Sequence, residues 1–162
     1  LIMFLSVNIA FSQSNKSNKY FFEQAEKYNK KKKFDSALYY IEKAIYTDSS
    51  CAKVYFLSAT IYENLHELEK ANTEYSKAIS IDPKPVYFNN RGINKAIKGH
   101  YAQAIKDYQK ALEINNGYKQ ALFNKAVAHY KMGEFQKACE DAKKAYSLGL
   151  MMAKQFIDRN CE

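Results

Sequence analysis

"YAQAIKDYQKALEIN", residues 101–115, decides the fold, because closely similar stretches occur three more times in the chain. They are "FDSALYYIEKAIYTD" from residue 34, "LEKANTEYSKAISID" from residue 68 and "FQKACEDAKKAYSLG" from residue 135. Each begins with an aromatic residue or leucine and has alanine three and ten residues later. The starts are separated by 34, 33 and 34 residues. A fixed period in this range indicates a repeat architecture.

Each period predicts two amphipathic helices joined by a short turn. In the third period, residues 86–97 read as one helix, Lys98–His100 supply the turn, and apolar residues then follow helical spacing at Ala104, Ile105, Tyr108, Ala111 and Leu112. A small residue recurs in every first helix, where it lets the two helix backbones approach closely: Ala25, Ala59, Gly92 and Ala126. A single helix pair cannot bury both of its faces, so neighbouring pairs must stack.

This pattern resembles the tetratricopeptide repeat (TPR) family over residues 18–149. Tyr28 and Tyr62 match the aromatic position of the family's first helix, and Pro83 matches its proline between repeats. Lys95 and His129 depart from the aromatic position, which we expect to soften individual repeats without changing the fold. The resemblance implies an all-α solenoid of four helix-turn-helix units followed by a capping helix.

The sequence therefore predicts the following organisation. Four TPR units fill residues 18–149, with a polar linker before them and a capping helix after them. The units are 18–51, 52–84, 85–118 and 119–149, the linker is 13–17, and the cap is 150–162. Gly149 is the expected stop of the last repeat helix, and Met152, Phe156 and Ile157 are expected to face the last repeat.

Residues 1–12 differ in composition from the rest, being apolar and uncharged. The stretch is too short to span a bilayer, which needs about 20 residues. It fits the apolar region and cleavage site of a secretory signal whose first residues precede Leu1; a buried N-terminal helix or strand is the alternative. The mature chain would then lack a transmembrane segment and be periplasmic or secreted, or cytoplasmic if the segment is not a signal.

The three cysteines matter if the chain is exported, because disulfides persist in oxidising compartments. Cys139 and Cys161 flank Gly149 at similar distances, so an antiparallel helix hairpin would bring them to similar heights. A disulfide between them would attach the capping helix to the last repeat. Alternatively, Cys139 is a small buried residue and Cys161 lies at a frayed end. Cys51 is interpreted as a small residue at a helix start.

Nothing in the sequence indicates an enzyme, a cofactor or a metal site. His66, His100 and His129 belong to different repeats, and motifs that bind phosphate or metal are missing. The net charge of +8 favours acidic partners or anionic surfaces in general. The run Lys30–Lys33 falls in the first turn, where a solvated turn is the favoured interpretation and contact with phosphate, anionic lipid or an acidic protein is the alternative. Nucleic-acid binding is not expected.

The resemblance implies that a protein or peptide partner binds along the concave surface lined by the first helices. Phe22 and Glu26 stand where a carboxylate-binding version of the family has lysine and asparagine, so that version is not expected. Phe22, Phe56 and Phe123 either face the partner or pack between units. The positions predicted to face the partner are Phe22, Glu26, Asn29, Phe56, Thr60, Glu63, Asn89, Ile93, Phe123, Val127 and Tyr130.

The predicted function is thus a protein-protein interaction module, an adaptor or scaffold in a cell-envelope assembly. The alternative is a permanent structural subunit of a larger envelope complex, without exchange of a peptide ligand. The identity of the partner and the oligomeric state cannot be read from the sequence.

Overall fold

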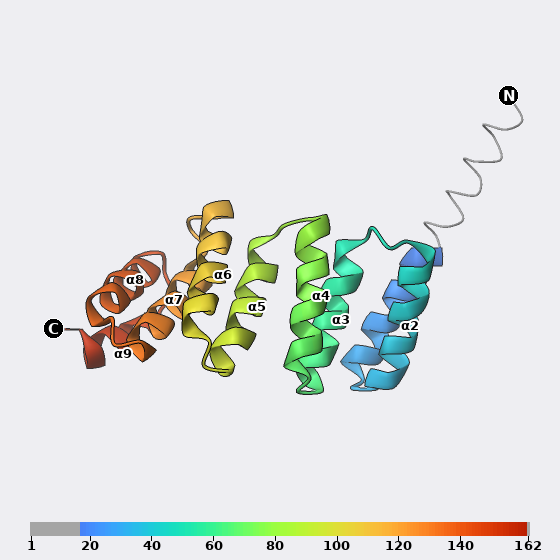
Figure 1. The fold of residues 1–162 in the computed structure, drawn as a ribbon, viewed down its shortest axis with the longest axis horizontal. Helices are drawn as coiled ribbons and strands as arrows, with labels where there is room; N and C mark the ends of the chain where they lie inside the picture. The colour runs from blue at the N-terminus through green and yellow to red at the C-terminus, as the bar shows by residue number, and fades with distance from the viewer. Residues whose placement is uncertain (1–16, 162) are drawn as a thin grey trace, which may run out of the picture. The chain divides into compact units, whose positions relative to one another are not determined.

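The computed structural model describes residues 17–161, and the regular secondary structure within them is helical throughout (Figure 1). The expected signal segment lies outside the described residues. Within them, no helix has the length and apolar character needed to cross a membrane. The first helix, α1, covers residues 17–30. The others are α2 Phe34–Thr47, α3 Ala52–Asn64, α4 Leu68–Ile81, α5 Pro85–Ile97, α6 Tyr101–Ile114, α7 Lys119–Lys131, α8 Phe135–Ser147 and α9 Met152–Asn160.

The described chain divides between Asp82 and Pro83 into two compact units. In the first unit, α3 and α4 pack side by side, and α2 also contacts α3. In the second unit, α5 packs on α6 and α7 on α8, while α6 joins the two pairs through α7. The two helices expected in each of the four periods are therefore present. The bend at Asp82–Lys84 precedes Pro85, a residue suited to the first position of a helix because it needs no N–H partner there.

The core of each unit lies between helices, at the small and large positions of the repeat. In the first unit, Ala25, Ala37 and Ala44 are fully buried together with the larger Ile41, Val54 and Ile61. In the second unit, the cluster of Leu122, Ala145 and Ala153 joins α7, α8 and α9. Small side chains occupy the helix crossings because only they allow close contact between backbones.

Gly92 shows how tight one crossing is. A Cβ atom added at Gly92 would lie 2.6 Å from Cε1 of Tyr108, whose ring is 1% exposed. The third repeat thus combines glycine on α5 with a buried tyrosine on α6. Because the aromatic ring fills the space that a methyl group would need, the sequence difference between Gly92 and the alanines of the other repeats has a packing cause.

The turns within the repeats share one geometry. Each first helix ends with a residue in the left-handed region, namely Lys32 (φ 55°), His66 (φ 60°), Gly99 (φ 79°) and Gly133 (φ 77°). The next residue donates its backbone N–H to a carbonyl five residues earlier, as in the bond from His100 to Lys95 (2.9 Å). This hydrogen bond satisfies a carbonyl that the helix end leaves open. Gly149 (φ 83°) ends α8 in the same way, as predicted.

The contact between the two helices of a repeat changes chemistry along the chain. In the first repeat, the rings of Tyr28 and Tyr40 stack with centroids 5.4 Å apart. In the third repeat, the corresponding residues are Lys95 and Asp107, whose charged groups lie 2.7 Å apart. In the fourth repeat they are His129 and Asp141, with 3.7 Å between Nε2 and Oδ2. The departures from the aromatic position are therefore each matched by an acidic residue on the second helix.

The capping helix α9 packs against α8 as predicted, but its inward face differs in one residue. Ala153 is fully buried and Phe156 and Ile157 are partly buried, whereas Met152 is 61% exposed. The expectation for Met152 is wrong, because the helix begins at that residue and the next position, Ala153, takes the close contact with the last repeat.

Candidate partner-binding surface

An apolar pocket of about 270 Å³ lies between the two repeats of the second unit. Two of the predicted partner-facing residues line it, Ile93 from α5 and Val127 from α7, and both are partly exposed. They come together because α5 and α7 are the first helices of successive repeats and stand at equivalent positions. The other lining residues are Ala96, Ile97, Tyr101, Tyr108, Asn124, Ala128 and Lys131.

The pocket combines an apolar lining with a few polar groups. Burial, together with the neighbouring Asp107, raises the pKa of Tyr108, so its hydroxyl stays neutral at physiological pH. Ile97 is 66% exposed and Lys131 is exposed, so an aliphatic side chain and an ammonium group are both accessible beside the pocket. An apolar recess with a few polar groups around it can hold an apolar side chain and orient the chain that carries it.

Asn89 is buried, whereas the prediction has it exposed toward a partner. Its side chain is 4% exposed, and its Oδ1 accepts a hydrogen bond of 2.9 Å from Asn124 on the neighbouring first helix. An amide buried in this way must be paired within the protein. Asn89 therefore links α5 to α7, and the accessible groups of this face lie farther along the helices, at Ile93 and beyond.

The aromatic residues predicted in the fourth repeat contact the capping helix. The ring of Phe156 on α9 meets Phe123 edge-on at 5.9 Å between centroids and Tyr130 at 5.5 Å. Tyr130 also contacts Phe135 on α8, at 5.3 Å. Phe123 and Tyr130 therefore pack against the capping helix α9. Their rings form an aromatic cluster that holds α9.

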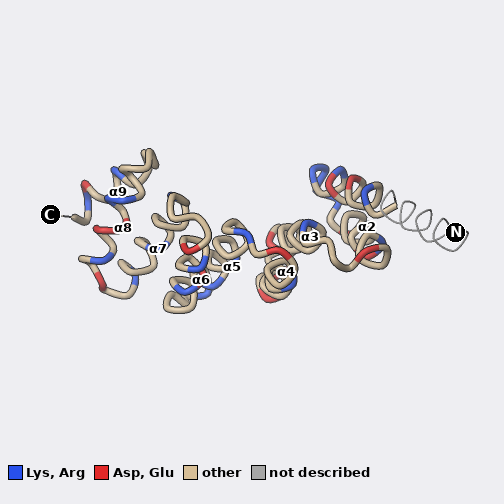
Figure 2. The backbone as a smooth tube through the Cα atoms, turned by 90° about the horizontal axis from the view of Figure 1, so that it is seen from above, with Lys and Arg blue, Asp and Glu red and all other residues tan. Residues whose placement is uncertain are grey.

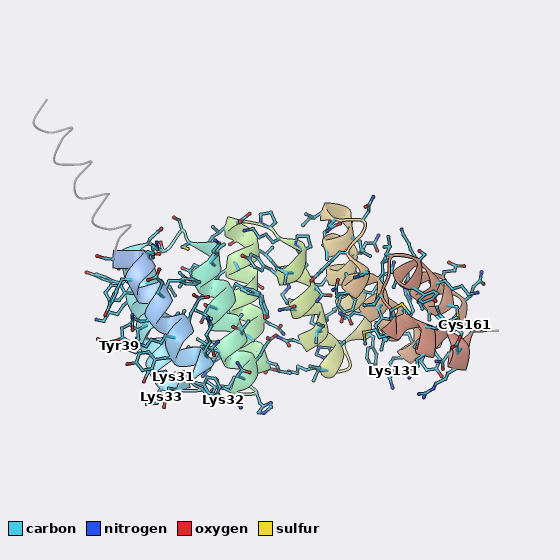
Figure 3. All side chains as sticks on the ribbon, turned by 180° about the vertical axis from the view of Figure 1, so that it is seen from behind. Lys31, Lys32, Lys33, Tyr39, Lys131 and Cys161 are labelled. Atoms are coloured by element: carbon cyan, nitrogen blue, oxygen red, sulfur yellow. A yellow bond between two sulfur atoms is a disulfide. The ribbon has the colours of Figure 1, made fainter. Side chains whose placement is uncertain are left out.

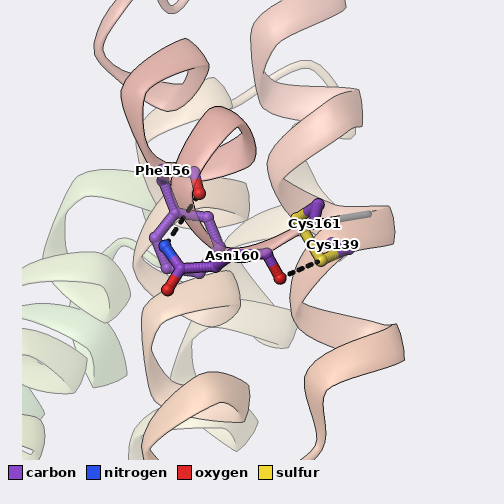
Figure 4. Close-up of a disulfide and its surroundings, with 4 residues drawn as sticks. All are labelled: Cys139, Phe156, Asn160 and Cys161. Carbon is purple, nitrogen blue, oxygen red and sulfur yellow. Dashed lines mark hydrogen bonds between the residues drawn. A yellow bond between two sulfur atoms is a disulfide. The ribbon is translucent and has the colours of Figure 1, made fainter.

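A disulfide between Cys139 and Cys161 attaches the end of α9 to α8, with Cα atoms 5.6 Å apart (Figure 4). The carbonyl oxygen of Asn160 lies 3.5 Å from Sγ of Cys139, and the Asn160 amide donates to the Phe156 carbonyl at 2.8 Å. The bridge therefore closes the helix hairpin around Gly149 at its open end. Cys51 is a free, partly buried thiol before α3.

In the first unit, the predicted positions form a more polar surface. Phe22 packs against the buried cluster of the unit, and the Phe56 ring lies 5.9 Å from that of Tyr75. Thr60 donates to the Leu57 carbonyl at 2.8 Å. Glu26, Asn29 and Glu63 are partly exposed. Glu26 and Thr60 occupy the repeat positions that Ile93 and Val127 hold in the second unit, so the first unit has polar groups where the second has its apolar pocket.

Several residues of the candidate surface were missed by the sequence analysis. Ile97 and Lys131 each lie one helical turn after a predicted position, so extending the same spacing would have found them. Tyr101 and Tyr108 come from α6, a second helix, and the assumption that first helices alone line the surface excluded them. Among the described residues, no group of three or more His, Cys, Asp or Glu side chains is placed to hold a metal ion.

Comparison with known proteins gives one consistent result. A profile described as "TPR repeat" matches residues 95–133, and one described as "Tetratricopeptide repeat" matches 52–85 and 119–148. The human tetratricopeptide repeat protein 13 is 28% identical over 127 residues, which are 78% of this chain and 14% of that protein. The chain therefore spans about a seventh of the length of this curated relative.

Solved structures show the same fold at low sequence identity. A crystal structure of MamA has a TM-score of 0.78 and 20% identity, covering 86% of this chain and 78% of its own. The first TPR domain of Spaghetti (RPAP3), bound to the HSP90 peptide SRMEEVD, has a TM-score of 0.65 and 23% identity, covering 69% of this chain and 91% of its own.

Proposed function

The chain belongs to the tetratricopeptide repeat family, and from that premise we propose that it is a binding module that holds a segment of a partner protein on its first helices. The observation that carries the proposal is the apolar pocket of about 270 Å³ between α5 and α7. One apolar side chain of the partner would enter it, beside Ile93 and Val127. An acidic group of the partner would approach Lys131.

The mode of recognition proposed here differs from capture of a terminal carboxylate. The Spaghetti domain shows that this fold can hold a short peptide. In the present chain, however, Phe22 packs on the core and Glu26 carries a negative charge at the positions where a carboxylate-binding version needs amide and ammonium groups. A phenyl ring and a carboxylate cannot hold a second carboxylate. Apolar anchoring in the second unit is therefore the basis of the proposal.

A place in the cell envelope is part of the proposal. Two independent features support it: the apolar character of residues 1–12, which fits a secretory signal, and the disulfide between Cys139 and Cys161. Disulfides form and persist in oxidising compartments, of which the periplasm and the outside of the cell are examples. In this setting the module would act as an adaptor or scaffold.

The alternative, a permanent subunit of a larger envelope complex, rests on a different observation. Large apolar side chains near the C-terminal end of the second unit are well exposed, including Phe135 at 56%, Met151 at 67% and Met152 at 61%. Exposed apolar surface of this kind is typical of an interface that is covered in the assembled protein. The two functions differ in whether the partner exchanges.

A pair of isoleucine variants tests the proposed site. The tagged chain, its Ile97→Glu variant and its Ile114→Glu variant would be used to capture partners from an envelope extract of the source cell. Ile97 lines the pocket and is 66% exposed; Ile114 ends α6 outside the pocket and is 48% exposed. Both positions accept a charge without burying it, so circular dichroism should show unchanged folding.

We expect that the unchanged chain and Ile114→Glu retain a partner that Ile97→Glu loses. A carboxylate beside the pocket would lose water when an apolar side chain enters, and it would repel an acidic group. Equal retention by all three proteins would show that the pocket is not the binding site. Partner that remains bound through dilution and long washing, with no exchange against added free protein, would favour the permanent subunit.

A further inference from the structure

The turn between α1 and α2 carries four consecutive lysines, Lys30–Lys33, and all four are exposed. Within the described part of the chain, none of their ammonium groups forms an ion pair or hydrogen bond with a carboxylate. Elsewhere, exposed lysines often have such a partner, as Lys110 has in Glu113 at 2.7 Å. In Figure 2, blue basic segments and red acidic segments are scattered along a mostly tan backbone. The first turn therefore concentrates positive charge that the protein does not neutralise.

The other repeats show that the turn does not need lysine in order to fold. The corresponding residues are "NLHE" at 64–67, "IKGH" at 97–100 and "KMGE" at 131–134, with at most one lysine in each. Lys32 stands in the left-handed region at φ 55°, where the third and fourth repeats have Gly99 and Gly133. Glycine adopts this conformation more readily than lysine does. The lysine run is therefore a property of the surface and not of the fold.

Tyr39 adds an exposed aromatic ring to the same end of the first unit (Figure 3). Its side chain is 54% exposed, and Nζ of Lys43 lies 5.4 Å from the ring centroid. The corresponding positions of the later repeats hold Thr73, Lys106 and Glu140, so helix packing does not require an aromatic residue there. A half-exposed tyrosine, which combines an apolar ring with a polar hydroxyl, suits a boundary between polar and apolar media.

We propose that Lys30–Lys33 and Tyr39 form a docking surface for an anionic lipid bilayer. Clustered lysines are attracted to a negatively charged membrane surface, with roughly a fivefold gain in partitioning for each lysine that reaches it. Tyrosine is enriched at the level of the lipid headgroups. The surface belongs to the first unit, whereas the apolar pocket belongs to the second.

An extended anionic surface fits this turn better than a single bound anion does. Lys32 and Lys33 line a common hollow of about 330 Å³, but Asp35 lines it too. The Asp35 carboxylate would repel a phosphate held in the hollow. A bilayer, by contrast, would meet the exposed lysines from outside and needs no enclosed site. An acidic protein segment carries the same sign of charge as an anionic bilayer, and binding to polyglutamate distinguishes the two.

Vesicle co-sedimentation tests the proposal with a charge-matched pair of variants of the full chain. The test variant is Lys31→Gln, Lys32→Gly, Lys33→Gln; the control is Lys53→Gln, Lys106→Gln, Lys143→Gln, which removes the same charge from other exposed positions. Lys32→Gly places the favoured residue at a left-handed position, so the test variant should melt no earlier than the unchanged chain. The vesicles contain phosphatidylglycerol and phosphatidylcholine in equal parts, or phosphatidylcholine alone.

We expect the unchanged chain and the control to bind the anionic vesicles alike, and the test variant to partition about a hundredfold more weakly, since three lysines are lost. Tyr39→Ser should weaken binding a few fold, and Tyr39→Phe should retain it. Equal binding by the two triple variants would overturn the proposal. So would undiminished binding to phosphatidylcholine alone, or binding to polyglutamate without binding to the anionic vesicles.

Discussion

Replacing Asp107 by asparagine should destabilise the second unit strongly. The Asp107 side chain is 6% exposed and accepts hydrogen bonds from both Nε and Nη2 of Arg91, at 3.0 and 2.7 Å. It also accepts a hydrogen bond from Nζ of Lys95, at 2.7 Å. One carboxylate thus pairs two cations between α5 and α6. Asparagine has nearly the same shape, so the substitution removes the negative charge and leaves the packing in place.

The magnitude follows from the burial of the three groups. Removing one partner of a buried ion pair costs about 3–5 kcal/mol, because the remaining charge stays desolvated. The side chains of Arg91 and Lys95 are 19% and 22% exposed, so water can stabilise each of them in part. We therefore expect the free energy of unfolding to fall by about 2–4 kcal/mol. With a urea dependence of about 1–3 kcal/mol per molar, the unfolding midpoint should fall by roughly 1 M or more.

Urea unfolding followed by circular dichroism measures this effect, with Glu113→Gln as the matched control. Glu113 pairs with Lys110 at the surface, where both side chains are more than half exposed, so its loss should cost at most about 0.5 kcal/mol. Adding Lys95→Tyr to Asp107→Asn restores the aromatic residue of the earlier repeats and removes one unpaired cation, and it should recover part of the loss. An Asp107→Asn midpoint as high as that of Glu113→Gln would refute the argument.

Three further predictions concern packing, the cap and pH. Gly92→Ala should destabilise the protein by about 1–2 kcal/mol in urea unfolding, because the new methyl group meets the Tyr108 ring at 2.6 Å. Gly117→Ala, where the new methyl group would lie 3.5 Å from Oδ1 of Asn115, should not. Cys161→Ser removes a bridge between residues 22 apart. It should lower stability by about 3 kcal/mol and speed amide exchange in α9 before that in α7, whereas uniform exchange would contradict a local latch. Hydrogen bonds from His129 and Lys137 lower the pKa of Glu134 below 4.5, so its stabilising effect is present above that pH and is lost as the pH falls through the lowered value. Glu134→Gln should therefore flatten the acid limb of the curve of stability against pH, and an unchanged limb would argue against the contact.

The sequence alone was sufficient to predict the repeat and its helices. The recurrence of alanine at fixed positions, and of Ala25, Ala59, Gly92 and Ala126 in the first helices, specifies pairs of helices that cross closely. These are local and periodic signals, because a helix face repeats every three to four residues and a helix pair every 34 or so. The positions of the turns, the stop at Gly149 and the existence of α9 follow from the same signals.

The candidate surface could be predicted only in part. Spacing along one helix identified Ile93 and Val127, but it could not show that Asn89, on the same face, bonds to Asn124 and is buried. It also could not show that Phe123 and Tyr130 are covered by Phe156 from α9. Whether a side chain faces solvent or a neighbouring helix depends on that neighbour, which a single helix period does not contain.

Charge pairing shows the same division between local pattern and tertiary structure. In the sequence, Lys95 and His129 are departures from the aromatic position of the first helix. Nothing in the sequence indicates that Lys95 contacts Asp107 or that His129 contacts Asp141. Folding brings them together across the helix pair, so that Lys95 meets the buried Asp107 and the His129 ring lies beside the partly buried Asp141. The sequence by itself determined a four-repeat helical solenoid with a cap. Only the tertiary structure decided which polar groups pair with one another, which aromatic rings pack together and which side chains stay accessible, because those outcomes depend on contacts between residues far apart in the chain.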